Sequence, residues 1–556
     1  MNNMKHFIEK VADHGDKPVF KYFDKSRTLH EVTYTEFSAK AKAEAAGFDA
    51  LGLAGGKIAI AGETSPEWVM TYVSSIAAGG VAIPLDRELS ADELGGFMRM
   101  VDATAIAFAK SFEAKALAIA AACPDIKSFV CFDPVGVETD DARFTTLACV
   151  LEAGEKGIAS GYTIPEPEDM NNLAEYLFTS GTTGTSKCVM LSQKNVCSTI
   201  NCACECVEFF PEDTIVSVLP IHHTYELCCL VAGMNYGMTI GINDSLKHIL
   251  KNLATFRPTG LVLVPLIVNT MYKRIWDEAK KSGRDGKLKV GIKLSRALRA
   301  VGIDVRAKLF GEVVSAFGGR LERIVCGGAP LNAQMVKSFE EFGITIMEGY
   351  GITECSPLVS VNPYFALKSG SVGPAVSCCE AKIVDGAPNA DGVEVGEICV
   401  KGDNVMLGYY ENEEENARVF TEDGYFRTGD MGYLDRDGYI YITGRKKSVI
   451  ILESGKNVYP EELEEYLAKI DLIAEAVVVG RKIPAEDTIL LTAVVYPDAN
   501  KFEKGASESE MLEAIKAQIM QMNKKLPTYK HIKDVELRTT EFEKTTSRKI
   551  KRHLVS

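Results

Sequence analysis

The sequence predicts an α/β protein with a large N-terminal domain and a small C-terminal α+β domain. Short apolar, β-rich runs alternate with amphipathic helical patterns up to about Gly370, which implies largely parallel sheets covered by helices. Beyond Gly370 short segments with Asp-Gly turns take over, and we expect a small β-barrel-like subdomain there. From Arg445 a compact α+β pattern follows. We therefore predict one domain over residues 1–444 and a second over residues 445–556.

The composition is that of an ordinary globular protein with an acidic surface. Of the 556 residues, 46% are hydrophobic and 25% are charged, which leaves little room for long disorder. The formal net charge is −14. Because non-specific nucleic-acid binding needs a basic footprint, we expect no nucleic-acid partner, and any anionic ligand must be met by local basic residues.

The cysteines and the apolar runs predict a cytoplasmic protein. All fifteen cysteines fall between Cys123 and Cys399, an odd number with poor spacing for a disulfide scaffold, so we expect free thiols in a reducing compartment. The N-terminus has no apolar stretch of signal-peptide length. The most apolar runs, residues 76–85 and 260–268, are shorter than the ~20 residues of a membrane-spanning helix.

The first clear strand–helix–strand unit begins with a strand at Lys57–Ala61. Ser65 is a helix cap followed by Pro66 at the first helical position, and Trp68 begins an apolar stripe at helical spacing. Two glycines end this helix, and Val81–Pro84 is expected to form the next strand.

The C-terminal half contains turn dipeptides and one clear helix. Pro460–Ile470 shows an amphipathic pattern with its apolar positions on one face. The expected turns lie at Asp385-Gly386, Asp391-Gly392, Asp423-Gly424 and Asp437-Gly438.

A loop rich in hydroxyls and glycines is the strongest local motif. Glycines let a backbone approach a phosphate closely, hydroxyls donate to phosphate oxygens, and a lysine adds positive charge. The spacing differs from G-x-x-x-x-G-K-[ST], so we expect a phosphate loop of another kind; the alternative is a flexible surface loop. The residues that carry this prediction are Thr179, Ser180, Gly181, Thr182, Thr183, Gly184 and Lys187.

The segment Leu219–Glu226 contains adjacent histidines, His222 and His223. They could be a partly buried pair or part of a metal site that includes the upstream thiols. We weigh against metal binding, because the spacing of those thiols is not a usual zinc pattern and the helical pattern around Asn201 would spread them around a helix. The thiols are Cys202, Cys204 and Cys206.

Three later motifs contain further candidate ligand-binding residues. Gly327-Gly328-Ala329 follows an apolar run and could be only a turn. Glu348–Glu354 offers a flat aromatic face for stacking and a hard carboxylate ligand for Mg²⁺, although it could also be a strand end with a helix cap. Tyr425–Asp430 ends in a carboxylate that could accept both hydroxyls of a ribose, or could simply be a turn aspartate.

Two basic stretches mark the C-terminal part. The first, Arg445–Lys447, lies at the predicted domain boundary, where a charge run is normally only a solvated face. The second, Lys544–Arg552, could contact an anionic membrane peripherally or could simply be solvated.

In this order and spacing, the motifs resemble those of the adenylate-forming enzymes, which include acyl- and aryl-CoA synthetases, luciferases and peptide-synthetase adenylation domains. Leu219–Glu226 has the form typical of long-chain acyl-CoA synthetases, so the chain is most similar to bacterial long-chain fatty acid–CoA ligases. The resemblance covers nearly the whole chain. Three positions depart from the family pattern: Ser186 and Cys188, because Ser186-Lys187-Cys188 stands for Pro-Lys-Gly, and Arg548, which stands for a glycine.

The resemblance implies an ATP site. The hydroxyl-rich loop would bind the phosphates, Gly327, Gly328 and Ala329 would lie against the adenine, and Tyr350, next to Gly351, would stack on it. The other implied roles are Thr353 for the phosphate, Glu354 for Mg²⁺, Asp430 for the ribose and Arg445 for the ribose or a phosphate.

The resemblance also implies a mobile C-terminal domain. Lys447 would be the hinge and Lys549 the catalytic lysine of adenylation. His223 and Glu226 would belong to the acyl pocket, and the CoA-binding residues would be Gly455, Lys456, Asn457 and Tyr459.

The implied reaction is ATP-dependent conversion of a fatty carboxylate to an acyl-adenylate, followed by transfer to coenzyme A, with Mg²⁺ as cofactor. Three alternatives remain open at this point: an acyl carrier protein as acceptor, a medium-chain or aryl substrate, and a non-catalytic nucleotide-binding module. The sequence does not determine the acyl chain length, the pathway or the oligomeric state.

Overall fold

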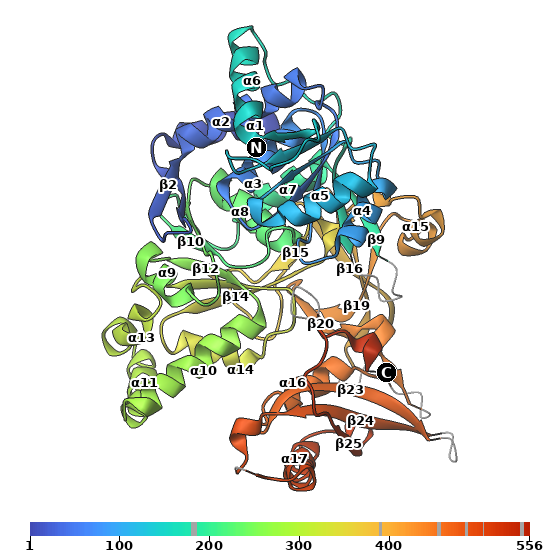
Figure 1. Cartoon of the computed structure of the whole chain (residues 1–556). Helices are drawn as coiled ribbons and strands as arrows, with labels where there is room; N and C mark the ends of the chain where they lie inside the picture. Colours follow the sequence, from blue (N-terminus) through green and yellow to red (C-terminus); the bar gives the residue numbers. More distant parts are fainter. Residues whose placement is uncertain are drawn as a thin grey trace. The chain divides into compact units, whose positions relative to one another are not determined.

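The computed structural model describes the chain except for residues 180–185, 389–391, 453–456, 484–487, 504, 545–549 and 556; at 457, 483, 488 and 553 only the backbone is described. The described residues form two compact units (Figure 1). The first unit comprises Met1–Glu380 and Val400–Phe426, and the second comprises Ala381–Cys399 and Arg427–Ser556.

The first unit contains two eight-stranded sheets. One has the order β18-β9-β8-β4-β3-β5-β6-β7 and is parallel from β8 to β7, whereas β9 and β18 run antiparallel to their neighbours. Its strands are β3 (Lys57–Ala61), β4 (Val81–Leu85), β5 (Ala105–Phe108), β6 (Ser128–Cys131), β7 (Phe144–Thr146), β8 (Leu173–Thr179), β9 (Lys187–Ser192) and β18 (Gly408–Tyr409).

The second sheet has the order β15-β14-β13-β12-β10-β11-β1-β2. It is parallel from β14 to β1, and an antiparallel strand closes each edge. Its strands are β1 (Pro18–Phe23), β2 (Leu29–Thr33), β10 (Thr214–Ser217), β11 (Thr239–Ile242), β12 (Gly260–Leu263), β13 (Arg323–Cys326), β14 (Thr345–Gly351) and β15 (Leu358–Val361).

Helices cover these sheets and separate them. α7 packs on β8 and β9, α8 packs on β10 and β11, and the two helices contact each other. α4 and α5 cover one face of the first sheet, and α9, α10 and α14 cover one face of the second. The helices are α1 (Met4–Val11), α2 (Tyr34–Ala50), α3 (Pro66–Ala77), α4 (Ala91–Met100), α5 (Glu113–Ala122), α6 (Leu147–Ala159), α7 (Gln193–Cys202), α8 (Thr224–Asn235), α9 (Ile249–Phe256), α10 (Pro265–Lys281), α11 (Asp285–Arg299), α12 (Arg306–Leu309), α13 (Gly311–Ser315), α14 (Ala333–Glu340) and α15 (Glu413–Val419).

The second unit is built around smaller sheets. The region expected to be β-barrel-like forms a four-stranded sheet, β16-β17-β19-β20, and the C-terminal part packs α16 and α17 on the three-stranded sheet β23-β24-β25. The elements are β16 (Cys379–Pro388), β17 (Glu394–Gly402), β19 (Phe426–Leu434), β20 (Ile440–Arg445), β21 (Ile450–Ile451), β22 (Asn457–Val458), α16 (Pro460–Leu467), β23 (Ile473–Ile483), β24 (Thr488–Pro497), α17 (Glu508–Asn523) and β25 (Asp534–Leu537). The predicted α/β class, with a large parallel-sheet domain and a smaller C-terminal domain, is confirmed; the boundary at residue 444 stays a prediction.

Most of the predicted local elements are confirmed. β3 and β4 lie where expected, and the Ser65 hydroxyl caps α3 by accepting a hydrogen bond from the amide of Trp68. Gly424 and Gly438 adopt positive φ angles of 82° and 80° in the predicted turns. Among the described residues, no helix is both long enough and apolar enough to cross a bilayer.

Three local predictions differ from the structure. Asp385-Gly386 is not a turn, because both residues lie inside β16, where Asp385 has a φ of 55° and a Cβ on Gly386 would lie 2.5 Å from Glu394 on β17. The dipeptide therefore absorbs a local irregularity within a strand instead of reversing the chain. The helix predicted to reach residue 470 ends at Leu467, and the helix around Asn201 ends at Cys202, before the other two thiols. Asp391 lies outside the described residues.

Candidate active site

A cavity in the first unit collects residues from three of the predicted motifs. It contains about 570 Å³ of unfilled space, part of it open to solvent. Its walls come from α8, from the turns that follow α7 and β13, from the end of β14, and from β15 with the residue before it. The lining residues are Ala203, Val207, Tyr225, Cys228, Cys229, Val325, Gly327, Gly328, Gly349, Tyr350, Gly351, Pro357, Leu358 and Val361. The walls are mainly apolar, which suits an apolar ligand or a flat ring.

Two glycines shape this cavity by leaving backbone uncovered. Gly328 has a φ of 83°, a conformation that side chains rarely adopt, and it turns the chain just after β13. A Cβ on Gly351 would lie 2.0 Å from the carbonyl oxygen of Pro357, so a larger residue would displace the strand that carries Tyr350. Gly327, Gly328, Tyr350 and Gly351 therefore line one cavity, whereas Ala329 is exposed in the turn beyond them; their contact with adenine stays a prediction.

Helix α8 contributes Tyr225 to the cavity wall. Its hydroxyl donates to the carbonyl oxygens of Val325, at 3.1 Å, and Leu263, at 3.3 Å, which fixes the ring between the ends of β12 and β13. His223 is the residue before the first turn of α8, and its ring lies 4.2 Å from that of His222. The cavity wall includes Tyr225 from this motif; the acyl-pocket role of His223 and Glu226 stays a prediction.

Glu226 is a buried acid behind this wall. Its side chain is 2% exposed and accepts a hydrogen bond from the Ser217 hydroxyl on β10. Burial raises the pKa of Glu226 to about 8, because a charged carboxylate loses its hydration there. At neutral pH the protonated, uncharged form is therefore favoured.

The hydroxyl-rich loop joins two paired strands. Thr179 at the end of β8 pairs with Lys187 at the start of β9, and the Thr179 hydroxyl donates to the Lys187 carbonyl oxygen at 3.4 Å. The loop therefore closes a hairpin at the carboxyl end of a strand from a parallel sheet, a frequent place for ligand sites. Ser180, Gly181, Thr182, Thr183 and Gly184 lie outside the described residues.

Strand β18 connects this loop to the predicted Mg²⁺ ligand. The Tyr409 hydroxyl donates to Oε1 of Glu354 at 2.8 Å, and Nζ of Lys187 lies 4.5 Å from the centre of the Tyr409 ring. Lys187 also forms an ion pair of 2.5 Å with Glu415 on α15. Burial and the Glu354 charge both raise the pKa of Tyr409, so it remains a hydrogen-bond donor. Thr353 begins the same short 3₁₀ turn as Glu354.

In the second unit, Asp430 and Arg445 face each other across β19 and β20. Nε of Arg445 lies 2.7 Å from Oδ1 of Asp430, whose side chain is nearly buried while that of Arg445 is half exposed. The amide of Asp430 also donates to the Thr428 hydroxyl at 3.0 Å. The ion pair fixes a carboxylate next to an accessible guanidinium.

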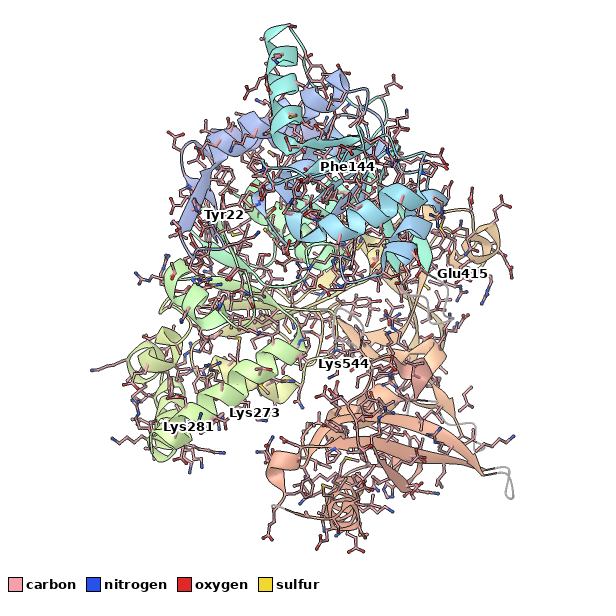
Figure 2. All side chains as sticks on the ribbon, viewed as in Figure 1. Tyr22, Phe144, Lys273, Lys281, Glu415 and Lys544 are labelled. Carbon is pink, nitrogen blue, oxygen red and sulfur yellow. The ribbon has the colours of Figure 1, made fainter. Side chains whose placement is uncertain are left out.

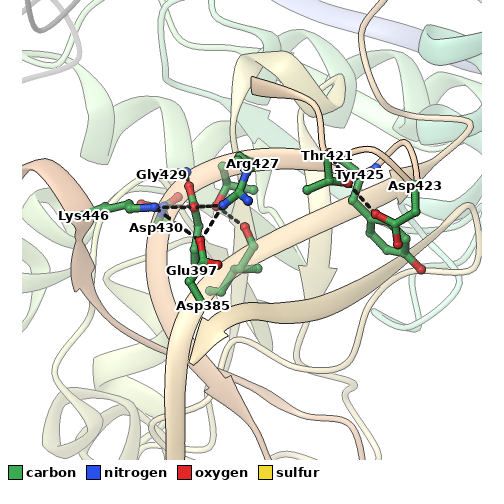
Figure 3. Close-up of polar contacts among 11 residues, drawn as sticks. Asp385, Glu397, Thr421, Asp423, Tyr425, Arg427, Gly429, Asp430 and Lys446 are labelled. Atoms are coloured by element: carbon green, nitrogen blue, oxygen red, sulfur yellow. Dashed lines mark hydrogen bonds and ion pairs between the residues drawn. The ribbon is translucent and has the colours of Figure 1, made fainter. Parts of the chain in front are cut away.

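A buried carboxylate on the neighbouring strand β17 binds residues on both sides of this ion pair. Glu397 on β17 is 3% exposed and accepts hydrogen bonds of 2.8 Å from both Arg427 and Lys446 (Figure 3). It also accepts from the amide of Gly429 at 3.2 Å. One carboxylate thus binds the stretch of β19 before Asp430 and the lysine after Arg445.

The remaining predicted residues are only partly described. Lys447 is exposed in the 3₁₀ turn Lys446–Ser448, and Tyr459 is the residue before the first turn of α16. The backbone of Asn457 pairs with Ile451. Gly455, Lys456 and Lys549 lie outside the described residues, as does Arg548.

Sequence analysis missed Tyr409 and Glu415. Both lie more than 200 residues from Lys187, which they contact, and no local pattern marks them. It also missed the thiols that line the cavity, Cys228 and Cys229, because cysteines inside an apolar helix look like ordinary core residues.

The thiols after α7 do not gather as a metal site. Throughout the described parts of the chain there is no group of three or more His, Cys, Asp or Glu side chains placed to hold an ion. Sγ of Cys202 instead lies 3.3 Å from Sγ of Cys378, and burial raises the pKa of Cys204 to about 12.

Comparison with known proteins identifies a family for both parts of the chain. The family model described as "AMP-binding enzyme" matches residues 7–410, and the model of the AMP-binding enzyme C-terminal domain matches residues 447–556. The chain is 28% identical to a long-chain-fatty-acid–CoA ligase, FadD15, of Mycobacterium bovis, over 95% of this chain and 90% of that protein. It is 29% identical to human long-chain-fatty-acid–CoA ligase 1, over 79% of this chain and 65% of that protein.

Solved structures share the fold. The ATP-bound crystal structure of MatB from Rhodopseudomonas palustris superposes with a TM-score of 0.73 at 26% identity and covers all of this chain and 98% of that one. The anthranilate CoA ligase AuaEII in complex with anthranoyl-AMP superposes with a TM-score of 0.76 at 18% identity, over all of this chain and 96% of that one, which shows a common fold.

Proposed function

Because this chain belongs to the AMP-binding enzyme family, we propose that it is an AMP-forming acid–thiol ligase that activates a fatty carboxylate as the acyl-adenylate and transfers the acyl group to coenzyme A. The observation that carries the proposal is the cavity, in which Tyr225, Gly327-Gly328 and Gly349–Gly351 come together from three separate motifs. The relatives named long-chain-fatty-acid–CoA ligase support a long-chain substrate.

The first half-reaction makes a good leaving group. A carboxylate is a poor acylating agent because its oxygen is a poor leaving group. Attack of the carboxylate oxygen on the α-phosphorus of ATP forms a mixed anhydride, breaks the bond to the β-phosphate bridging oxygen and releases pyrophosphate. The protein's contribution is to position the reactants and to neutralise charge. We assign the phosphates to the loop that ends at Lys187, the adenine to Tyr350 and the α-phosphate to Thr353.

Glu354 fits the role of the Mg²⁺ ligand in this proposal. It offers a carboxylate oxygen, the hard donor that Mg²⁺ prefers, and the hydrogen bond from Tyr409 to Oε1 fixes its orientation. When bound, the ion would offset negative charge on the phosphates. The contact between the Tyr409 ring and Lys187 ties this carboxylate to the phosphate loop.

The roles in the second unit rest on its own geometry. Asp430 is fixed by Arg445, and we propose that it accepts the hydroxyls of the ribose. We propose that Lys549 assists the first half-reaction and that a turn about Lys447 then withdraws it. The thiolate of coenzyme A attacks the acyl carbon, the bond to the AMP oxygen breaks and AMP leaves. Residues 455–459 would face the thiol in this second half-reaction.

The test is carboxylate-dependent exchange between ATP and pyrophosphate over a series of fatty acids of increasing length. We expect exchange with long-chain acids and Mg²⁺, and thioester formation when coenzyme A is added. A chain that binds ATP but shows no exchange with any carboxylate would be a non-catalytic nucleotide-binding module.

The same assay separates the remaining alternatives. If exchange is strongest with aryl or medium-chain acids, the assigned substrate class changes. Aryl acids belong in the series because the anthranilate CoA ligase AuaEII shares this fold. Exchange without thioester formation on coenzyme A, but with transfer to an acyl carrier protein, would change the acceptor.

A further inference from the structure

We propose that helix α11 and the turn after it form a docking surface for an anionic lipid membrane. The observation is an apolar stripe that faces solvent on a helix whose other side is packed, in a strongly basic stretch of an acidic chain. The inference concerns binding to a surface and does not depend on which carboxylate the protein activates.

Helix α11 has two apolar faces and buries only one. Leu288 and Ile292 pack against the core of the second sheet, and Ser295 is fully buried between them and the next turn. On the opposite side, Val290 is 65% exposed and Leu294 is 48% exposed, four residues apart and thus on one line along the helix. A buried stripe is explained by folding, whereas an exposed stripe of large apolar residues on a stable helix calls for a partner.

The exposed stripe continues beyond the helix. Val301, two residues past the end of α11, is 71% exposed, and Ile303 is 52% exposed. Four large apolar side chains therefore face solvent within fourteen residues of chain. Their arrangement matches the apolar side of helices that lie in the plane of a membrane interface.

The charge around this stripe is opposite to that of the whole protein. Residues 273–308 contain twelve Lys and Arg but only four Asp and Glu, in a chain whose net charge is −14. At 100° per residue, Lys287 and Lys293 lie about 60° to either side of the line through Val290. They would reach lipid phosphates while the stripe enters the apolar layer, because long lysine side chains extend along apolar surface toward polar groups.

Several of these lysines have no acidic partner in the described protein. The arginines on α11 and just before it are paired: Arg284 with Glu312, Arg296 with Glu341 and Arg299 with Glu340. Within the part of the chain that the structure describes, five exposed lysines of this region take part in no ion pair. Figure 2 labels one of them, Lys281 on α10. This set comprises Lys280, Lys281, Lys287, Lys293 and Lys308.

This division favours a membrane over a protein partner. The paired arginines hold α11 to the body of the unit. The unpaired lysines are strongly hydrated point charges, and they can interact with the spread negative charge of a lipid surface. A protein partner would be expected to meet the more discriminating guanidinium groups.

Flotation of the full-length protein with lipid vesicles tests the proposal. We expect binding to vesicles of equal parts phosphatidylcholine and phosphatidylglycerol, little binding to phosphatidylcholine alone, and loss of binding at high salt. The variant Lys287→Gln/Lys293→Gln should bind the anionic vesicles roughly twentyfold more weakly, because each lysine near such a surface contributes about fivefold. Val290→Asp should bind more weakly still.

Matched controls come from helix α6 and from the loop between β6 and β7. Lys156 is an exposed lysine on α6 and Val135 is an exposed valine, so Lys156→Gln and Val135→Asp should leave vesicle binding unchanged. Thermal unfolding of each variant checks that the fold is intact; the substituted side chains are exposed, and we expect unchanged midpoints.

A second variant reports contact directly. Tryptophan in place of Val290 should shift its fluorescence to shorter wavelength when anionic vesicles are added, and tryptophan in place of Val135 should not. Equal binding to both lipid mixtures, or a Val290→Trp emission that does not move, would overturn the proposal. So would sedimentation showing that Val290→Asp dissociates an oligomer without changing vesicle binding, because the stripe would then be an interface between copies of this chain.

Discussion

The Tyr409 hydroxyl donates a 2.8 Å hydrogen bond to the Glu354 carboxylate, although the two residues are 55 positions apart and lie on different elements. Because the Tyr409 ring also lies against Lys187, this one side chain links the end of the phosphate loop to the proposed metal ligand. The contact predicts that Tyr409 positions Glu354.

The variant Tyr409→Phe keeps the ring and removes the donor. We expect adenylation to slow by about tenfold and the Mg²⁺ concentration for half-maximal rate to rise, because an outer hydrogen bond of this kind typically contributes 10–100-fold. ATP–pyrophosphate exchange across a Mg²⁺ titration measures both effects. Tyr410→Phe, one residue further on, is the control and should behave as the native protein.

Glu354→Gln should slow adenylation more, by ~10²–10³, since it removes the charged group itself. If Tyr409 acts through Glu354, adding Tyr409→Phe to Glu354→Gln should cost little more. Additive losses in the double variant would show that Tyr409 acts independently of the carboxylate.

Lys549→Ala separates the half-reactions. We expect loss of adenylation, because the lysine charge that would stabilise the reacting carboxylate and α-phosphate is gone, while thioester formation from supplied acyl-adenylate continues. Lys551→Ala, two residues on, is the matched control. Equal loss of both half-reactions would contradict the assigned role.

Lys447→Pro should have the opposite pattern. Proline fixes φ near −65°, so a backbone that must rotate there would be held in one orientation. We expect acyl-adenylate to accumulate while thioester output falls, as measured in single turnovers. On a rigid linker the substitution would slow both steps in proportion.

We expect Glu44→Gln to make the free energy of unfolding less dependent on pH. Glu44 is fully buried between α2 and α3, accepts a 2.6 Å hydrogen bond from Thr71, and has a pKa raised to about 8 by burial. The folded protein therefore keeps a proton that the unfolded chain releases near pH 4.5, so stability is full below that pH and falls as the pH rises to about 8.

The expected result for Glu44→Gln follows from that sign. The variant should unfold like the native protein near pH 4.5 and should be more stable by a few kcal/mol at pH 8, because the amide carries no charge to bury. Denaturant unfolding at both pH values measures this. Glu155→Gln on the exposed side of α6 is the control, and equal stability of Glu44→Gln and native protein at pH 8 would refute the prediction.

Local structure was predictable where the residues that determine it are neighbours in the sequence. Ser65-Pro66 specifies a helix start through a side-chain cap and a fixed φ, and both act within three residues. Gly328 needs a backbone that only glycine readily adopts, so its motif could be placed at a turn.

Contacts made by strand pairing at long range were not predictable. Tyr409 reaches Lys187 only because β18 pairs with β9, and nothing within ten residues of Tyr409 indicates this register. Asp385-Gly386 misled for a related reason: the dipeptide is typical of a turn, but pairing with the neighbouring strand keeps it inside β16, with Asp385 at a positive φ. Tertiary pairing outweighs local preference in such strands.

The pairing of β18 with β9 has a consequence for the order in which the chain folds during synthesis. The first sheet's edge strand is made about 220 residues after its partner, and the first unit resumes at Val400 only after the chain has contributed Ala381–Cys399 to the second. A ribosome-bound chain that stops before residue 400 therefore exposes β9 as an open edge, where another nascent chain could pair. Translation through Tyr409 closes that edge, and the same event brings the phosphate loop's lysine to its aromatic neighbour.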